Sequence, residues 1–128
     1  MTAPRCTVVR VDQAPPDVRS AAGGRLGQAG LHRLDTASGT FWLLSLGAQP
    51  TAGHRLAVSG VEPAEEPARW RVRVQHQPPA AGALHAQVLT HPHLLFRLDG
   101  ELAEVWLEEP GGGRRIFASP PAPAGEAP

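Results

Sequence analysis

Apolar and polar residues alternate with a period of two along much of the chain, which is the pattern of strands with one buried face. The clearest example is RWRVRVQH at 69–76: Trp70, Val72 and Val74 share one face, which we expect in the core, and Arg71 and Arg73 should face water. Other short segments predict further strands at 7–12, 31–35, 40–46, 54–61, 84–90, 93–99, 103–109 and 114–119. Breaks rich in Pro or Gly separate these segments.

Two segments depart from simple alternation. The stretch TFWLLSL at 40–46 is nearly all apolar, as expected of a strand that is buried on both faces. Residues 18–30 contain four glycines and predict a loop with at most one helical turn. The sequence therefore predicts an all-β fold, a sandwich or small barrel of seven to eight mainly antiparallel strands.

Length and composition narrow the class of protein further. A chain of 128 residues is expected to form one domain, here 1–119, followed by a disordered Pro/Ala tail at 120–128. The 12 acidic and 12 basic residues balance, so no net field favours nucleic acid or anionic lipid. No apolar segment is long enough to cross a membrane, and the sequence predicts no membrane insertion.

The N-terminal residues predict the compartment. They lack the charged and apolar regions of a signal peptide, which predicts a cytoplasmic protein. An envelope or secreted location is expected only if the true start codon lies elsewhere. The single cysteine, Cys6, excludes an internal disulfide.

Residue patterns for catalysis are missing from the sequence. None of the five serines lies in a nucleophile elbow, and Cys6 has no histidine near it in the sequence. No Gly-rich loop leads into a helix to hold a phosphate. We therefore expect a protein that is not an enzyme and needs no cofactor.

The histidines raise the alternative of a metal site. His91 and His93 would share a strand face, and a tight hairpin across 77–83 would place His76 opposite His85. Pro92 interrupts the first pair, and neither cysteine nor many acids lie nearby. The sequence predicts polar edge or turn histidines and no metal, and a His-dependent metal-binding protein remains the alternative from another class.

Charged residues on two strands predict a solvated outer face. Arginines at 69, 71 and 73 lie opposite the apolar face of their strand, without the interleaved aromatics that nucleic-acid binding needs. Glu104 and Glu108 alternate in the same way on a later strand and could pair with them across a sheet.

The loop at 47–54 has the residues of a compact turn. Gln49 to Ala52 suit a type I turn in which Pro50 fixes φ, and Gly53 would take the left-handed conformation. Thr51 can cap local backbone groups. An ordinary hairpin turn accounts for all of these features.

A family resemblance gives the loop a second interpretation. Leu-Gly at 46–47, Pro-Thr-x-Gly at 50–53, an alternating Trp-containing strand, a Pro-Pro turn, QVLTHPH at 87–93 and the following Leu-Leu-Phe-Arg-Leu strand stand in this order. The order resembles the C-terminal domain of the protease complex subunit PrcB family over about residues 40–98. The family's loops are typically Thr-Gly-Gly-Tyr and Thr-x-Pro-Tyr. Here Ala52 replaces a glycine, and His54 and His93 replace the tyrosines, so these two histidines are expected to lie together.

The resemblance implies a non-enzymatic accessory subunit that associates with a protein partner, with a protease as the implied class. The partner-binding residues would come from two loops, 47–54 and 90–93. They are Gly47, Pro50, Thr51, Gly53, His54, Thr90, Pro92 and His93. A weaker resemblance, at Thr51 and Gly53 only, is to chagasin-type protease inhibitors, which present such a loop on an immunoglobulin-like sandwich.

Overall fold

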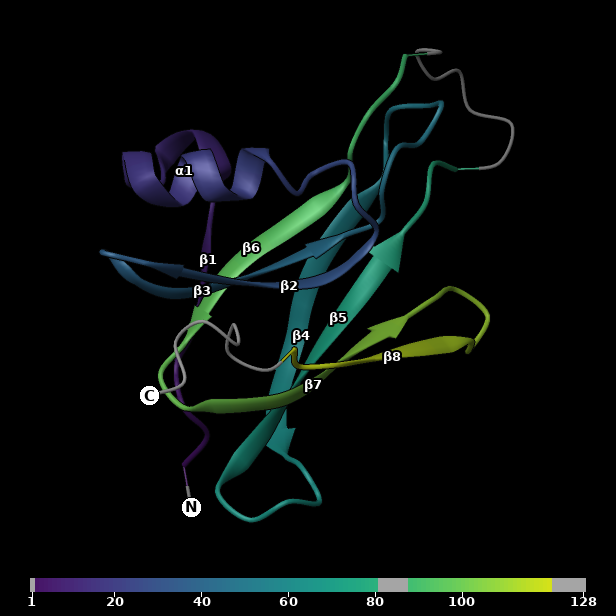
Figure 1. Cartoon of the computed structure of the whole chain (residues 1–128). Coiled ribbons are helices and arrows are strands. Elements are labelled where there is room, and N and C mark those ends of the chain that lie inside the picture. The colour runs from purple at the N-terminus through teal and green to yellow at the C-terminus, as the bar shows by residue number, and fades with distance from the viewer. Residues whose placement is uncertain (1, 81–87, 121–128) are drawn as a thin grey trace.

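The computed structural model describes residues 2–80 and 88–120 (Figure 1). Within these ranges eight strands form two four-stranded sheets, and there is one short α-helix. The predicted tail lies outside the described residues from 121 onward. The strands are β1 (Cys6–Val9), β2 (Gly30–Thr36), β3 (Gly39–Ser45), β4 (Arg55–Pro63), β5 (Arg69–Gln77), β6 (His93–Leu98), β7 (Glu101–Glu108) and β8 (Arg114–Ala118). A 3₁₀ turn, η1 (Val11–Gln13), and the helix α1 (Pro16–Gly23) follow β1.

The two sheets have the strand orders β1-β6-β3-β2 and β4-β5-β7-β8. Neighbouring strands are antiparallel except β5 and β7, which run parallel. The predicted sandwich of mainly antiparallel strands is thus confirmed. The strand predicted at 84–90 is wrong at its described end, where residues 88–90 contribute only a single bridge between Thr90 and Gln49. Residues 84–87 lie outside the described residues.

The main core lies between the two sheets. The sheet containing β3 and β6 contributes Trp42, Leu44, Leu94 and Phe96, and the facing sheet contributes side chains from β5 and β7, among them Val72, Val74, Val105 and Leu107. The predicted register of β5 is confirmed, because Trp70, Val72 and Val74 are buried. A shift of one residue would have placed the arginines in this core.

A second core lies on the other face of the β3 sheet, under helix α1 (Figure 1). Val18 and Ala22 of the helix are fully buried against Phe41, Leu43 and Leu95. The prediction of a loop over 18–30, with no helix beyond one turn, was wrong for residues 18–23, which are helical, and is confirmed for residues 24–29. The glycines at 23 and 24 stand at the end of the helix, so they end it and do not interrupt it.

Local contacts fix where this short helix begins. Pro16 occupies the first turn, where a missing N–H costs nothing. Asp17 accepts hydrogen bonds from the Val18 N–H and from the N–H and hydroxyl of Ser38, in the β2–β3 turn. These bonds to the carboxylate hold the pKa of Asp17 below its usual value. Asp17 therefore ties the start of the helix to the sheet beneath it.

None of the helices in the described residues is long and apolar enough to span a bilayer.

We expect Val18→Ala to lower the free energy of unfolding by about 2 kcal/mol, because it removes two buried methyl groups and leaves a cavity under the helix. Urea denaturation followed by Trp fluorescence measures this change. Ser20→Ala, on the exposed side of the same helix, is the control and should alter stability by less than about 0.5 kcal/mol. Equal stability of the two variants would show that the helix does not cover the sheet in solution.

Candidate functional site

The two loops singled out in the sequence both carry the chain from one sheet to the other. Residues 46–54 connect β3 to β4, and the segment that ends at Pro92 leads into β6. Strands β3 and β6 are antiparallel neighbours, and Ser45 pairs with His93. The end of β3 therefore lies beside the start of β6, which brings the two loops to the same end of the sandwich.

Hydrogen bonds continue the β3–β6 pairing into the loops. The Leu46 N–H donates to the Pro92 carbonyl at 2.9 Å, and Gln49 and Thr90 exchange two backbone bonds of 2.8 Å. The Thr90 hydroxyl donates to the Thr51 carbonyl, also at 2.8 Å. The loops consequently form one connected unit, which we call the paired loops (residues 46–54 and 90–93).

Two glycines shape the first loop. Gly47 is buried with φ of 74°, and its N–H donates to the Ser45 hydroxyl, which itself donates to the Leu26 carbonyl. A Cβ at Gly47 would lie 3.3 Å from the Ala29 Cβ. Gly53 has φ of 101°, the positive value predicted from the turn. Gly47 thus sets the loop conformation from within, while the residues around it reach the surface.

The paired loops border a small cavity of about 260 Å³ that is open to solvent. Residues of both loops line it: Ala52, Gly53, His54, Thr90, His91, Pro92 and His93. His54 and His93 therefore border one cavity. Immediately before Thr90, Val88 and Leu89 are 50% and 69% exposed, so two neighbouring apolar side chains lie in solvent. The surface combines imidazole rings, a hydroxyl-bearing turn and exposed aliphatic groups.

His54 contacts a residue that the sequence did not suggest. Its ring stacks on His76 of β5, with centroids 5.3 Å apart, and its Nδ1 lies 3.0 Å from His76 Nε2. His76 Nδ1 lies 2.6 Å from a carboxylate oxygen of Glu109, which follows β7. Glu109 also accepts a bond from Arg115. This series of side-chain contacts, from His54 through His76 to Glu109, fixes the end of the first loop to the second sheet.

The metal geometry considered from the sequence does not form in the described residues. His93 Nδ1 lies 2.7 Å from the His91 carbonyl, and no group of three or more His, Cys, Asp or Glu in ranges 2–80 and 88–120 could hold a metal ion. The hairpin that would pair His76 with His85 involves residues 81–87, so the described residues do not test it; β5 itself pairs with β4 as far as Gln77 and with β7 as far as Gln75. His85 itself lies outside the described residues.

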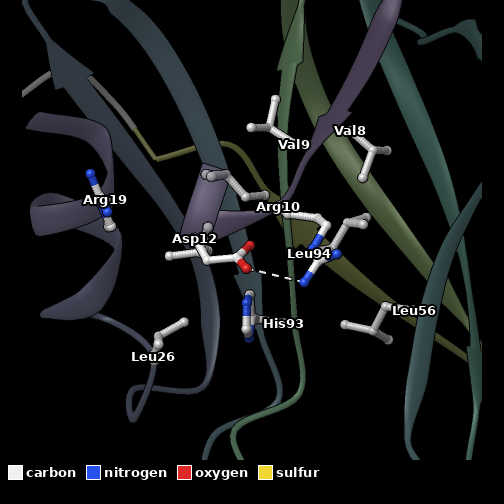
Figure 2. A pocket seen from close by; sticks show the side chains of 11 residues that line it. Val8, Val9, Arg10, Asp12, Arg19, Leu26, Leu56, His93 and Leu94 are labelled. Atoms are coloured by element: carbon white, nitrogen blue, oxygen red, sulfur yellow. Dashed lines mark hydrogen bonds and ion pairs between the residues drawn. The ribbon is translucent and has the colours of Figure 1, made fainter. Parts of the chain in front are cut away.

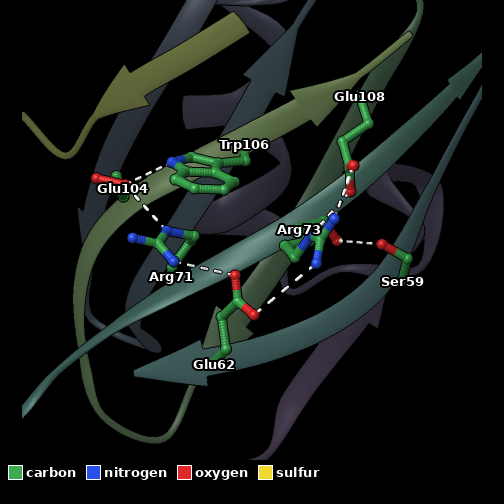
Figure 3. A network of polar contacts seen from close by, with 7 residues as sticks. All are labelled: Ser59, Glu62, Arg71, Arg73, Glu104, Trp106 and Glu108. Carbon is green, nitrogen blue, oxygen red and sulfur yellow. Dashed lines mark hydrogen bonds and ion pairs between the residues drawn. The ribbon is translucent and has the colours of Figure 1, made fainter. Parts of the chain in front are cut away.

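The outer face of the second sheet carries the charge pairs expected from the sequence (Figure 3). Arg71 bonds to Glu62 and Glu104, and Arg73 bonds to Glu108 through two nitrogens at 2.9 and 2.8 Å. The bonds from Arg73 hold the pKa of Glu108 below its ordinary value. These ion pairs join side chains of β4, β5 and β7, so they stabilise the pairing of the three strands.

Trp106 adds a feature that the alternating pattern did not reveal. The guanidinium carbons of Arg71 and Arg114, from the strands on either side of β7, lie 3.7 and 4.0 Å from its ring centroid. Arg71 lies on the outer face as expected, but its side chain is only 13% exposed because the Trp106 ring and its carboxylate partners cover it. Arg73, at 37%, is partly exposed as expected.

Cys6 is the one thiol in the chain. It lies on β1 and packs partly against the main core. Burial raises its pKa to about 11. The thiolate that nucleophilic catalysis requires is thus disfavoured at this position.

Comparison with known families places the paired loops in context. Residues 40–99 match the family model described as PrcB C-terminal. The chain thus carries a PrcB C-terminal domain over this segment, in agreement with the resemblance noted from the sequence. The matched segment runs from β3 through β6, so it holds the inner strands β3 and β6, the β4–β5 hairpin and both paired loops. Searches of curated proteins and of solved structures gave no match.

We expect Thr90→Val to lower the free energy of unfolding by about 1 kcal/mol, because it removes the hydroxyl bond to the Thr51 carbonyl while keeping the side-chain shape. Amide exchange of Thr51, Ala52 and Gly53 should become faster. Thr7→Val on β1 replaces an exposed threonine and serves as the control, with stability nearly unchanged. Unchanged exchange in Thr90→Val would show that the loops are held by other contacts.

We expect Cys6 to react with iodoacetamide at pH 8 about two orders of magnitude more slowly than free cysteine, because its raised pKa leaves little thiolate. The rate should keep rising as pH increases toward 11, and mass spectrometry of quenched samples measures it. Denatured protein is the control and should react like free cysteine. A native rate that levels off near pH 9 would contradict burial of the thiol.

Proposed function

We propose that this chain is a non-enzymatic protein-interaction module and acts as an accessory subunit that binds a protease. The observation that carries the proposal is the joining of the paired loops by four hydrogen bonds into one surface. Loops held on a rigid β scaffold are common sites of recognition. The PrcB C-terminal segment contains both loops, which supports a protease complex as the setting.

The chemistry of the surface suits protein recognition better than catalysis. The exposed aliphatic side chains of Val88 and Leu89 directly precede the second of the paired loops, and the loops themselves carry imidazole rings that can donate and accept hydrogen bonds. The Thr90 hydroxyl already donates to a backbone carbonyl, and Cys6 is partly buried in the core. An apolar patch with polar groups around it is typical of a protein contact.

The arrangement of the paired loops helps to distinguish an accessory subunit from the alternative, a protease inhibitor. A loop that inserts into an active-site cleft has to project beyond its neighbours. Here the first loop is bonded at Leu46, Gln49 and Thr51 to the second loop. This arrangement favours a partner that lies across both loops over one that receives a single protruding loop.

We expect the triple variant Thr51→Ala/His54→Ala/His93→Ala to capture the partner at least about tenfold less well than the unaltered chain, because it removes the polar tips from both loops. Leu89→Ser, which removes an exposed apolar group, should weaken capture without changing the melting temperature. The measurement is quantitative affinity capture from native cells, with the bound proteins identified by mass spectrometry.

Two controls separate binding from stability. His54→Gln keeps a group that can bond to His76, so comparison with His54→Ala shows how much of any loss comes from loosening the loop. Glu65 lies in the β4–β5 turn, and Glu65→Ala should not change capture of the partner. Equal capture by the unaltered chain, the triple variant and Leu89→Ser would refute the proposed site.

A further inference from the structure

A second cavity, larger than the one between the paired loops, lies where β1 separates from β6 (Figure 2). Its volume is about 600 Å³, within the range of roughly 300–1,000 Å³ that is typical of ligand sites. Aliphatic side chains from β1, η1, β4, β6 and the chain after α1 form most of its walls, among them Val8, Val11, Leu26, Leu56 and Leu94. Nothing in the proposed function makes use of this cavity.

The backbone of β6 changes its pairing at the cavity. Strand β1 pairs with β6 from Leu98 to Leu95, whereas β3 pairs with it from Phe96 to His93. At Arg10 the chain turns away from the sheet into η1. Among the described strands, His93 and Leu94 therefore have a neighbour on one side only. An extended segment placed there would continue the sheet along β6.

The rim of the cavity carries three charged side chains, and two of them form an ion pair with each other. Arg10 and Asp12 form an ion pair of 3.1 Å (Figure 2). Arg19 projects from the exposed side of α1 and has no ion-pair partner among the described residues. Because the rim has one cation in excess, it is complementary to a ligand with an acidic group beside its apolar part.

One residue connects the cavity to the paired loops. His93 lines this cavity and also the smaller one between the loops. A polypeptide that lies across the paired loops can therefore run on into the cavity without leaving the surface.

We propose that this cavity binds an extended segment of the protein partner, which pairs with β6 at His93 and Leu94 and inserts a large apolar side chain next to an acidic residue. The inference rests on the proposed function, because the partner is the one that contacts the paired loops. The open strand edge favours a polypeptide over a small amphiphile, since only a polypeptide supplies a backbone for β pairing. The walls provide the apolar pocket, and Arg19 selects the acidic neighbour.

Selection of short random peptides displayed on phage tests the proposal with the full chain as the target. The expected consensus has a large apolar residue flanked by Asp or Glu. Synthetic peptides with this consensus should bind Val8→Trp about tenfold more weakly or worse, because Val8 lies at the rim and the larger side chain fills the cavity. Ile116→Trp is the matched control, since Ile116 is 57% exposed, Val8 is 51% exposed, and β8 is remote from the cavity.

Arg19→Glu provides a second variant on an exposed helix position, where the fold should not change. Selection on Arg19→Glu should lose the acidic preference and keep the apolar one, whereas Arg5→Glu, outside the cavity, should keep both. Equal binding of the peptides to Val8→Trp and Ile116→Trp would overturn the proposal. Selection of no peptide, with sodium decanoate bound in the cavity instead, would overturn it in favour of a small amphiphile.

The same variants distinguish this inference from the proposed function. If Val8→Trp captures the cellular partner as well as Ile116→Trp does while the triple loop variant fails, the cavity proposal is wrong and the loop site stands. If the triple loop variant captures the partner normally, the proposed function itself fails. Because His93 lines both cavities, the double variant Thr51→Ala/His54→Ala is also tested, and loss of capture both in it and in Val8→Trp supports the two proposals together.

Discussion

Strand β3 has apolar side chains on both faces, and each face has to be covered for the chain to fold. Trp42 and Leu44 point toward the second sheet, and Phe41 and Leu43 point toward helix α1. The second sheet alone could not bury both faces of β3, because the face that carries Phe41 and Leu43 would remain in water. The two-turn helix exists because it completes that second cover, although a helix of its length would be marginal alone.

The position of the paired loops follows from the same strand. Because β3 and β6 are neighbours in the middle of their sheet, the chain leaves β3 and enters β6 at adjacent points. Both connections then cross to or from the second sheet, and their backbones pair with each other outside the ladder. The surface of the paired loops is therefore a consequence of strand order, and its chemistry can vary while its geometry is retained.

The strands with strict alternation or an apolar run were predictable from the sequence, because burial alone sets their register, as at Trp70 and Val72. The helix was missed because its signal is only Val18 and Ala22, and four glycines nearby suggested a loop. The pairing of His76 with Glu109 and of β5 with β7 depends on contacts between residues more than thirty positions apart. Local patterns carry no information on such contacts, whereas the family resemblance did locate the paired loops.

The two surfaces differ in their relation to the PrcB C-terminal segment. The paired loops lie wholly within residues 40–99, but the larger cavity is walled on one side by β4 and β6 and on the other by β1, η1 and the chain around α1. Substitutions at Val8, Arg10 or Arg19 can therefore reshape the cavity and its charged rim without touching the loops, whereas Leu26 and Ala29 also support Gly47. Under the two proposals, the loops provide one contact with the partner, and the N-terminal residues determine which partner segment the cavity accepts. His93 belongs to both surfaces, so a change at this position should affect both contacts at once.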